Sequence, residues 1–582
     1  MPEVSTQYKA RINAKVDRMQ AMYEENYKKD HLQLAENFTT RISKWLHYPK
    51  TDSRAGNNVK KSSRHNGKII DNTPVLALRT LATGLMNGLT PPTRNWFALR
   101  TNDSELNNNV VVKRYLEEVR DRINIVFKKA NLYASLLKVY RDYGLFGQGC
   151  IGVFEDDEDL MFIQPFTVGE YYISFDHKRR ATTFSRVYEK TVEQLISEFG
   201  IDNVTPKVLG MYRANQFNHV VEVKHLIQLN EDHIEGSAYV RNKKYIELYW
   251  EGSTNPSSHI SHGANDSNAE GTPYVLKISG YDEFPIQTPI FDSEDEEYAQ
   301  ISPGMDGLGD ARGLQIQEKS SLEAIEKKVR PPMVADVRMR GLRKSLLPGS
   351  VTYVDSEGAS NGFAPAFNVD FKVDELEVKS QQTRDRIDQA LFKDLFLLIS
   401  QIDRGQLTAT EIHALLQEKS FSLGGALIKL DVNLLAPLVN KAFTILEKQD
   451  LLPEPPEEAQ GHEIEIEYLS FLQLAQQSSD LNSIERFLNI ASVTVQLDEN
   501  ARNKINFSEL LERFGTKVGV PASILRSEEE VQEIEAETQR QQQMIDNAEI
   551  MGQTAKATKD ASQADTEGKN ALTDIIKEYG RG

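Results

Sequence analysis

The chain has 582 residues, a formal net charge of −18 and 39% hydrophobic residues. This composition is typical of a globular protein long enough for several domains, and it argues against disordered, collagen-like and simple basic nucleic-acid-binding chains. A single cysteine, Cys150, leaves no intramolecular disulfide, suits a reducing cytoplasm, and is expected to be a small buried side chain.

The N-terminal part shows helical patterns. Residues 5–48 are predicted to be helical because apolar side chains such as Ile12 and Val16 recur one turn apart. A basic loop follows, then a second helix over 74–89 and a third over 108–145. No secretory signal is expected at the N-terminus, and the longest apolar run is too short to span a membrane.

From Gly149 the hydrophobic period changes to two, which predicts short strands. A helix interrupts them, with Thr191 as its cap and Gly200 as its stop, and the polar run 251–271 is expected to be a surface loop. The predicted strands are 150–156, 160–166, 170–176, 182–190, 219–230, 244–250 and 274–281.

After residue 300 the pattern returns to helix. Residues 309–329 are predicted to form one helix, which ends before Pro331, and residues 371–400 form another. Only the second half of the latter carries an apolar stripe, so its first half must be solvated or packed through charge networks. The stripe consists of Ile387, Leu391, Leu395 and Leu398.

The C-terminal part is also predicted to be mainly helical. A capping box at 408–411 starts a helix that runs to about 449, with a kink expected at Gly424 and Gly425. A strand over 462–470 and a helix over 470–498 follow. The tail from Ser527 begins with another capping box and is expected to be helical, although its apolar stripe is thin.

The sequence contains no complete motif for nucleotide binding, metal binding or a catalytic nucleophile. The chain lacks a phosphate-binding loop and a nucleophile elbow, and His259 and His262 fall in the polar loop. The acidic run 292–297 lacks the ligand register of a calcium loop. We therefore expect no catalytic residues, no metal and no cofactor. A metal-dependent nuclease that uses the run 292–297 stays open as an alternative.

Three stretches carry a family resemblance. They are "LATGLMNGLTPPTRNWFAL" (81–99), "SPGMDGLGDARGLQIQEKSSLEAIEKKVRPPMV" (302–334) and "RGQLTATEIHALLQEKSFSLGGALIKLDVNLLAPLVNKAFTIL" (404–446). In this order and at these separations they resemble the head-to-tail connector, or portal, proteins of short-tailed bacteriophages.

The resemblance implies an α+β, mainly helical portal fold with an α/β wing, a two-helix stem, a small clip and a helical crown. The implied parts are a wing at 1–300, stem helices at 301–329 and 370–400, a clip at 330–369, a channel loop at 401–407, a kinked helix with wing return at 408–500, and a crown or helical tail at 501–582.

The resemblance also implies a non-enzymatic ring of about twelve subunits around a channel for double-stranded DNA. Such a ring nucleates capsid assembly, conducts genome packaging and ejection, docks the terminase large subunit and then tail adaptor proteins, and meets capsid and scaffold proteins. It would lie at a unique vertex of the virion, after assembly in the host cytoplasm and without membrane contact. A scaffold-binding assembly protein without a channel is a further alternative.

Charge is compatible with that role. Twelve copies at −18 each would carry a formal charge of about −216, and acidic walls do not trap DNA as many Lys and Arg side chains would.

Within the first stretch we expect a structural role in the wing. Glycines one turn apart let a helix approach another backbone closely, the proline ends that helix, and the aromatic pair supplies an apolar anchor. These residues are Gly84, Gly88, Pro91, Trp96 and Phe97, and contact of Arg94 with DNA or a neighbouring subunit is the alternative.

Two further sets follow from the resemblance. The residues expected to line the channel are Gln401, Asp403, Arg404 and Gln406. The basic residues expected to bind partners through the clip are Arg338, Arg340, Arg343 and Lys344.

Overall fold

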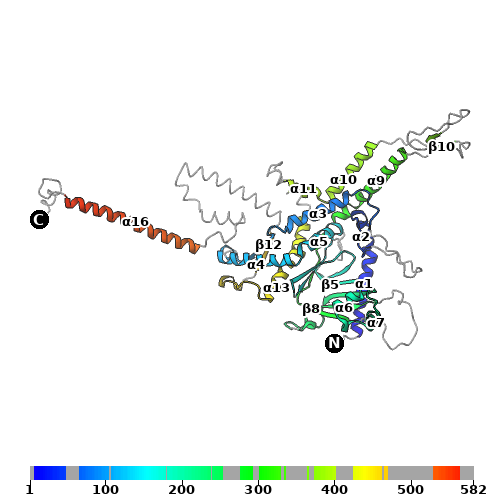
Figure 1. Cartoon of the computed structure of the whole chain (residues 1–582), viewed down its shortest axis with the longest axis horizontal. Helices are drawn as coiled ribbons and strands as arrows, with labels where there is room; N and C mark the ends of the chain where they lie inside the picture. The colour runs from blue at the N-terminus through cyan, green and yellow to red at the C-terminus, as the bar shows by residue number, and fades with distance from the viewer. Residues whose placement is uncertain are drawn as a thin grey trace. The chain divides into compact units, whose positions relative to one another are not determined.

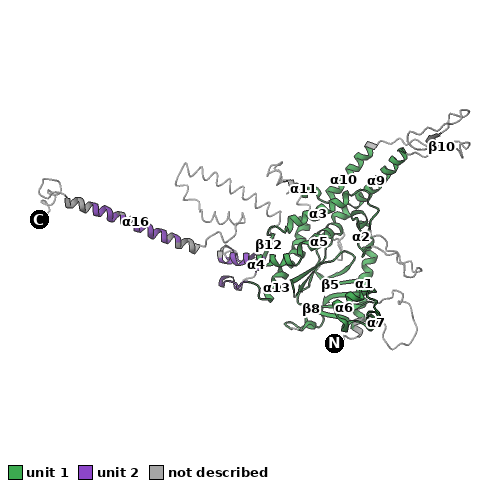
Figure 2. Cartoon of the chain, viewed as in Figure 1, with its two compact units in different colours: residues 1–98, 120–452, 466–476 green, residues 99–119, 453–465, 477–582 purple. Residues whose placement is uncertain are grey.

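The chain divides into two compact units. The computed structural model describes residues 6–46, 65–103, 106–156, 158–178, 180–237, 239–252, 275–292, 301–329, 333–335, 363–365, 373–401, 424–461, 464–468 and 528–563 (Figure 1). Unit 1 contains residues 1–98, 120–452 and 466–476, and unit 2 contains residues 99–119, 453–465 and 477–582 (Figure 2).

Two helices begin the chain, α1 (Thr6–Asn26) and α2 (Lys28–Phe38). The expectation of one helix over 5–48 is wrong, because the chain breaks at Tyr27 and turns extended at Thr39, where φ is −129° and ψ is 137°. The Thr39 hydroxyl donates to the carbonyl of Ala35 at 2.6 Å and so satisfies one of the last carbonyls of α2. The apolar face of α1 is buried as predicted, at Ile12, Val16 and Met19.

The next helix, α3 (Thr73–Leu89), matches its prediction and carries Pro74 in its first turn. The single helix expected over 108–145 is wrong: the structure has α4 (Val110–Lys129) and α5 (Leu132–Phe146). Asn131 separates them in the left-handed conformation, with φ of 57°, which a helix cannot contain. Between α3 and α4 lie β1 (Phe97–Thr101) and a short 3₁₀ turn, η1 (Leu106–Asn108).

Two antiparallel sheets form the β-rich part of unit 1, and all seven predicted strands are confirmed. The smaller sheet has the order β3-β2-β9, from β2 (Ile151–Asp156), β3 (Leu160–Pro165) and β9 (Ile286–Gln287). The larger sheet is a meander in chain order, from β4 (Tyr171–Phe175), β5 (Ala181–Thr191), β6 (Val220–Leu229), β7 (Tyr245–Glu251) and β8 (Val275–Tyr281). The residues of the predicted loop 251–271 lie outside the described part, except for the first two.

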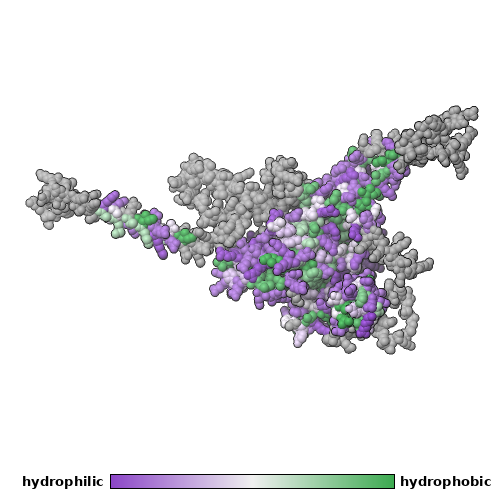
Figure 3. Space-filling view, viewed as in Figure 1, coloured by the Kyte–Doolittle hydropathy of each residue, from purple (hydrophilic) through white to green (hydrophobic). Residues whose placement is uncertain are grey.

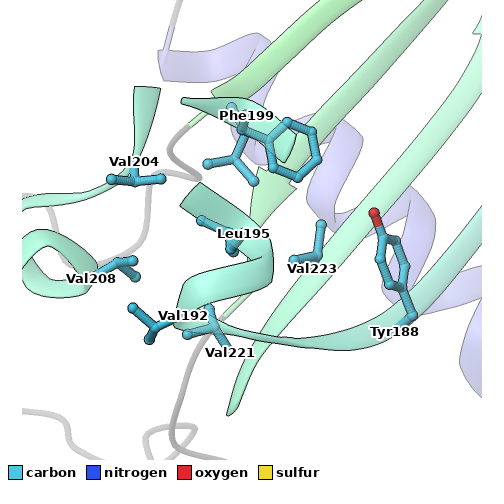
Figure 4. Packing of buried hydrophobic residues seen from close by; sticks show 9 residues of the cluster. Tyr188, Val192, Leu195, Phe199, Val204, Val208, Val221 and Val223 are labelled. Carbon is cyan, nitrogen blue, oxygen red and sulfur yellow. The ribbon is translucent and has the colours of Figure 1, made fainter. Parts of the chain in front are cut away.

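Helix α6 (Val192–Phe199) covers part of one face of this larger sheet, as Figure 4 shows. The Thr191 hydroxyl accepts from the N–H of Gln194 and Gly200 ends the helix with φ of 84°, so both predicted boundaries are confirmed. Leu195 packs toward Val223 of β6. Among the elements not predicted from the sequence are α7 (Pro206–Arg213) and two 3₁₀ turns, η2 (Ile201–Asn203) and η3 (Val240–Asn242).

The chain then leaves the sheets for a helix pair. After α8 (Pro303–Asp306), α9 (Leu308–Val329) matches its prediction. Where one helix was expected over 371–400, the structure has two, α10 (Val373–Ala390) and α11 (Lys393–Gln401). The prediction is wrong in this respect. Phe392 is left-handed, with φ of 52°, and the turn brings Leu395 onto Phe291, Phe392, Phe396 and Leu427.

A helical segment returns to the sheets. Residues 424–430 are α-helical, residues Asp431–Leu435 form a π-turn, and α13 (Ala436–Lys448) follows. The interruption that the structure describes is thus the π-turn, whereas the predicted kink at Gly424 and Gly425 lies at the edge of the described residues. Short elements after it are a 3₁₀ turn, η8 (Glu457–Ala459), and the predicted strand, β12 (Ile464–Tyr468).

Unit 2 contributes few packed elements among the described residues. Its turn at η1 is fixed by Asn107, whose amide donates to the carbonyl of Thr101 at 2.7 Å and whose Oδ1 accepts from the Thr101 N–H at 2.8 Å. The predicted tail helix is confirmed as α16 (Glu528–Gln563), and each of its described side chains is exposed. No helix in the described ranges is long and apolar enough to cross a membrane.

Candidate functional site: the α9–α10 helix pair

The central feature of the candidate site is the antiparallel packing of α9 and α10. Asp310 near the start of α9 accepts from Arg386 Nη2 at 2.8 Å, and Glu318 further along α9 accepts from Arg384 Nη2 at 2.8 Å. Residue numbers therefore rise along α9 as they fall along α10. Figure 1 shows the two helices side by side.

The base of the pair is fastened to the segment that precedes α3. The Gln315 side chain is buried, and its Oε1 accepts from the N–H groups of Ile70 and Asp71 at 2.6 and 2.9 Å. Its Nε2 donates to the Asp71 carbonyl at 2.9 Å. One amide side chain thus satisfies three backbone groups that no helix or strand would satisfy.

Arg384 adds an electrostatic link at the same place. Its Nε lies 2.9 Å from Asp71 Oδ2, while its Nη2 holds Glu318, so that one guanidinium joins α9, α10 and the segment before α3. Burial acts to raise the pKa of Asp71, but hydrogen bonds from Thr73 and Arg384 outweigh it and hold this pKa below its ordinary value.

Beyond this base, both helices expose apolar side chains. Ile316 on α9 and Val378 on α10 are 66% and 59% exposed. Each lies two residues, about 200° around its helix, from a buried neighbour, Leu314 or Ser380. The two apolar side chains therefore point away from the packed face of their own helix. Further exposed apolar residues on α9 are Leu322, Ile325 and Val329, and Figure 3 shows hydrophobic side chains along the pair.

The segment between the helices starts and ends in paired strands. β10 (Met333–Ala335) and β11 (Phe363–Pro365) are antiparallel, with Val334 opposite Ala364. The residues between them form an insert whose two ends meet. The predicted clip residues Arg338, Arg340, Arg343 and Lys344 lie in that insert, outside the described residues.

The predicted channel loop is described only at its first residue. Gln401 is the last residue of α11, so α11 leads directly into this segment. Asp403, Arg404 and Gln406 lie outside the described part of the chain.

The aromatic anchor predicted after α3 is present. Trp96 and Phe97 are 1% and 0% exposed, with ring centroids 4.7 Å apart, and both contact the ring of Phe127 on α4. The Trp96 indole N–H donates to the Tyr133 hydroxyl at 3.4 Å. Pro91 is buried just after α3 ends, and Arg94 is exposed.

The close approach at Gly84 involves a different partner from the one expected. A Cβ on Gly84 would lie 2.2 Å from Cγ of Phe396, so the glycine makes room for a side chain of α11 and not for another backbone. This contact places α11, the helix that ends at Gln401, against α3. Gly88, one turn later, is half-buried.

Two of the residues considered for other chemistry take structural positions. Cys150 is buried, and burial raises the pKa of its thiol, as expected of an inert side chain. Asp292 lies 2.7 Å from Lys429 Nζ, while the rest of the acidic run and the two loop histidines lie outside the described residues. Within the described ranges, no group of three or more His, Cys, Asp or Glu side chains could hold a metal ion.

A polar network that was not predicted from the sequence lies inside the larger sheet. Arg186 Nε donates to His225 Nδ1 at 3.1 Å, and His225 Nε2 lies 2.8 Å from Glu247. The hydroxyls of Tyr249 and Tyr281 also donate to Glu247, at 2.9 and 2.8 Å. Burial lowers the pKa of His225 to about 4. Charged residues at inward strand positions were the available signal, but their partners lie on other strands.

Comparison with known proteins gives consistent results. The family model for bacteriophage head to tail connecting proteins matches residues 27–525. The chain is 35% identical over 555 residues to the "Portal protein" of Salmonella phage epsilon15, covering 94% of this chain and 97% of the relative. It is 30% identical over 516 residues to the "Probable portal protein" of Bordetella phage BPP-1, covering 89% and 90%. The family match includes the helix pair and its insert.

Proposed function

The chain belongs to the family of bacteriophage head to tail connecting proteins, and from this premise we propose that it is a portal protein that forms a ring around a channel for double-stranded DNA. The ring would lie at one capsid vertex, seed capsid assembly, pass the genome during packaging and ejection, and dock the terminase large subunit before the tail adaptor proteins. The family match over residues 27–525 is the observation that carries this proposal.

The helix pair is compatible with the stem of such a ring. In a cyclic ring, one surface of each subunit meets a different surface of its neighbour. Ile316 and Val378 supply two such surfaces, because they lie on different helices and face away from the helix–helix contact. Burying both against neighbouring copies would remove apolar area that one chain leaves in water.

We assign the other parts by the same reasoning. The insert bounded by β10 and β11 would be the clip, and its basic residues Arg338, Arg340, Arg343 and Lys344 would meet acidic surfaces of terminase and tail proteins. The segment after α11 would be the channel loop, with Gln401, Asp403, Arg404 and Gln406 toward the DNA. The sheets and N-terminal helices would form the wing, and the C-terminal residues the crown.

The proposal is tested by the mass of the purified full-length protein. We expect particles of about twelve times the 65.9 kDa chain, seen as rings in negative stain. Ile316→Glu and Val378→Glu should each shift the mass distribution toward smaller species, since each places an unpaired charge in the interface. Ile201→Glu is the matched control, because Ile201 is 47% exposed in η2 and should leave the rings intact.

The possible outcomes test ring formation and the assigned subunit contact separately. A wild-type protein that stays monomeric at every concentration tested would contradict the ring. Wild-type rings that persist in both stem variants would contradict only the assignment of α9 and α10 to the subunit contact. Circular dichroism of the variants distinguishes lost assembly from lost folding.

A further inference from the structure

The helical segment 424–448 contains a π-turn with an identifiable cause. Pro437 has no N–H, so the carbonyl of Asn433 loses its α-helical partner. The N–H of Ala436 donates to the carbonyl of Asp431, five residues earlier, in place of the usual four. Two successive carbonyls, those of Val432 and Asn433, thus lack their α-helical donors. The α-helical hydrogen-bond ladder of the segment is therefore interrupted at this turn.

A carboxylate with an unsatisfied oxygen lies in this turn. Asp431 is half-buried, and its Oδ1 is shielded from solvent without a hydrogen-bond partner among the described residues. An ionised oxygen in that position is costly, because it has lost water and gained no donor.

The neighbours of Asp431 cannot relieve that cost in the observed arrangement. Tyr140 and Tyr143 on α5 face it, but the first pairs with the Thr90 hydroxyl at 3.1 Å and the second donates to the Ala426 carbonyl at 2.9 Å. Lys429 on the same helix is bound to Asp292 and the Phe291 carbonyl. On α13, Lys441 is 3.9 Å from Glu155 and 4.0 Å from Glu283.

We propose that Asp431 is a protonation-dependent joint: the neutral acid holds the π-turn against α5, and the ionised carboxylate drives the turn to open so that Oδ1 reaches water. Opening would release residues 424–435 from α5 while α13 stays packed on β2 and β3. Because residues 424–435 follow the proposed channel loop in the chain, the joint would let this part of the segment move independently of the sheets. The joint itself does not depend on ring formation.

The titration range fits such a joint. Burial raises the pKa of Asp431 to about 6, so its charge changes close to neutral pH. The folded state with a closed turn binds the proton more tightly than open or unfolded states do. The preference for the closed turn is therefore complete below pH 3.8, is lost as the pH rises toward about 6, and does not change further above that.

Hydrogen exchange of the full-length protein at about pH 5 and about pH 8, corrected for the intrinsic pH dependence of exchange, tests the joint. We expect amides of residues 430–440 to be about tenfold less protected at the higher pH, the factor carried by one pKa unit. Asp431→Asn is isosteric and cannot ionise, so this segment should be equally protected at both values.

Asp388→Asn is the matched control. Asp388 also has a buried oxygen without a partner among the described residues, and it lies in α10, outside the π-turn. Its other oxygen lies 2.6 Å from Lys393 Nζ. This variant should keep the pH dependence of residues 430–440. A wild-type protein without pH-dependent protection there, or an Asp431→Asn variant that retains it, would overturn the joint.

Discussion

Charged side chains are buried inside the larger sheet, whereas those of the α9–α10 pair are partly exposed. In the sheet, Arg186, His225 and Glu247 are almost fully buried and satisfy one another across three strands. In the helix pair, the side chains of Arg384 and Arg386 remain 27% and 55% exposed, and apolar side chains point outward. The buried charges of the sheet thus find their partners within the sheet, whereas the helix pair leaves apolar side chains exposed.

Of the changes proposed for the sheet and the helix pair, removal of Glu247 should lower the free energy of unfolding most. Glu247→Ala would leave the buried His225 ring and two tyrosine hydroxyls without their partner, which should cost about 3–5 kcal/mol of unfolding free energy. Glu189→Ala changes an exposed residue of β5 in the same sheet and should cost under about 0.5 kcal/mol. Urea titration of the full chain measures both. Equal costs would contradict a closed network in the sheet.

Acid should weaken the sheet through His225. Its pKa is about 4 when folded, against 6.5 ordinarily, so the unfolded chain binds the proton more readily. The stability from neutral His225 is complete above pH 6.5 and is lost as pH falls toward 4, by at most about 3 kcal/mol.

The difference between wild type and His225→Gln isolates that contribution, measured as unfolding free energy at about pH 7 and about pH 4.5. His31 also has a pKa lowered to about 4 by burial, but it is common to both proteins and cancels. Identical pH profiles would show that His225 does not link the strands.

The smallest effect should come from the two arginines of the helix pair. Arg384→Ala loses Asp71 and Glu318 and should cost about 1 kcal/mol, since the site is partly exposed. Arg386→Ala loses its exposed pair with Asp310 and a 3.3 Å hydrogen bond to the Thr383 hydroxyl, and should change thermal unfolding by no measurable amount. A larger loss of stability in Arg386→Ala than in Arg384→Ala would contradict the assignment of Arg384 as the residue that fastens the helix pair.

Local sequence was sufficient for several features. Alternation of apolar residues located all seven predicted strands, and Thr191 with Gly200 located the ends of α6. These features depend on backbone geometry and on side chains within a few residues of each other. The helix α9 and the tail helix α16 followed from the same local signals.

Other features needed contacts between distant residues. Helical periodicity continued through Tyr27, Asn131 and Phe392, yet the chain turns at each of them. The partner of Gly84 is Phe396, about three hundred positions away, and the acceptor for His225 lies on another strand. Sequence by itself determined the seven longer strands of the two sheets, most of the long helical segments and, through family resemblance, the portal function. Only the tertiary structure decided where helices break and which buried charges pair, because both depend on packing energies between segments far apart in the chain.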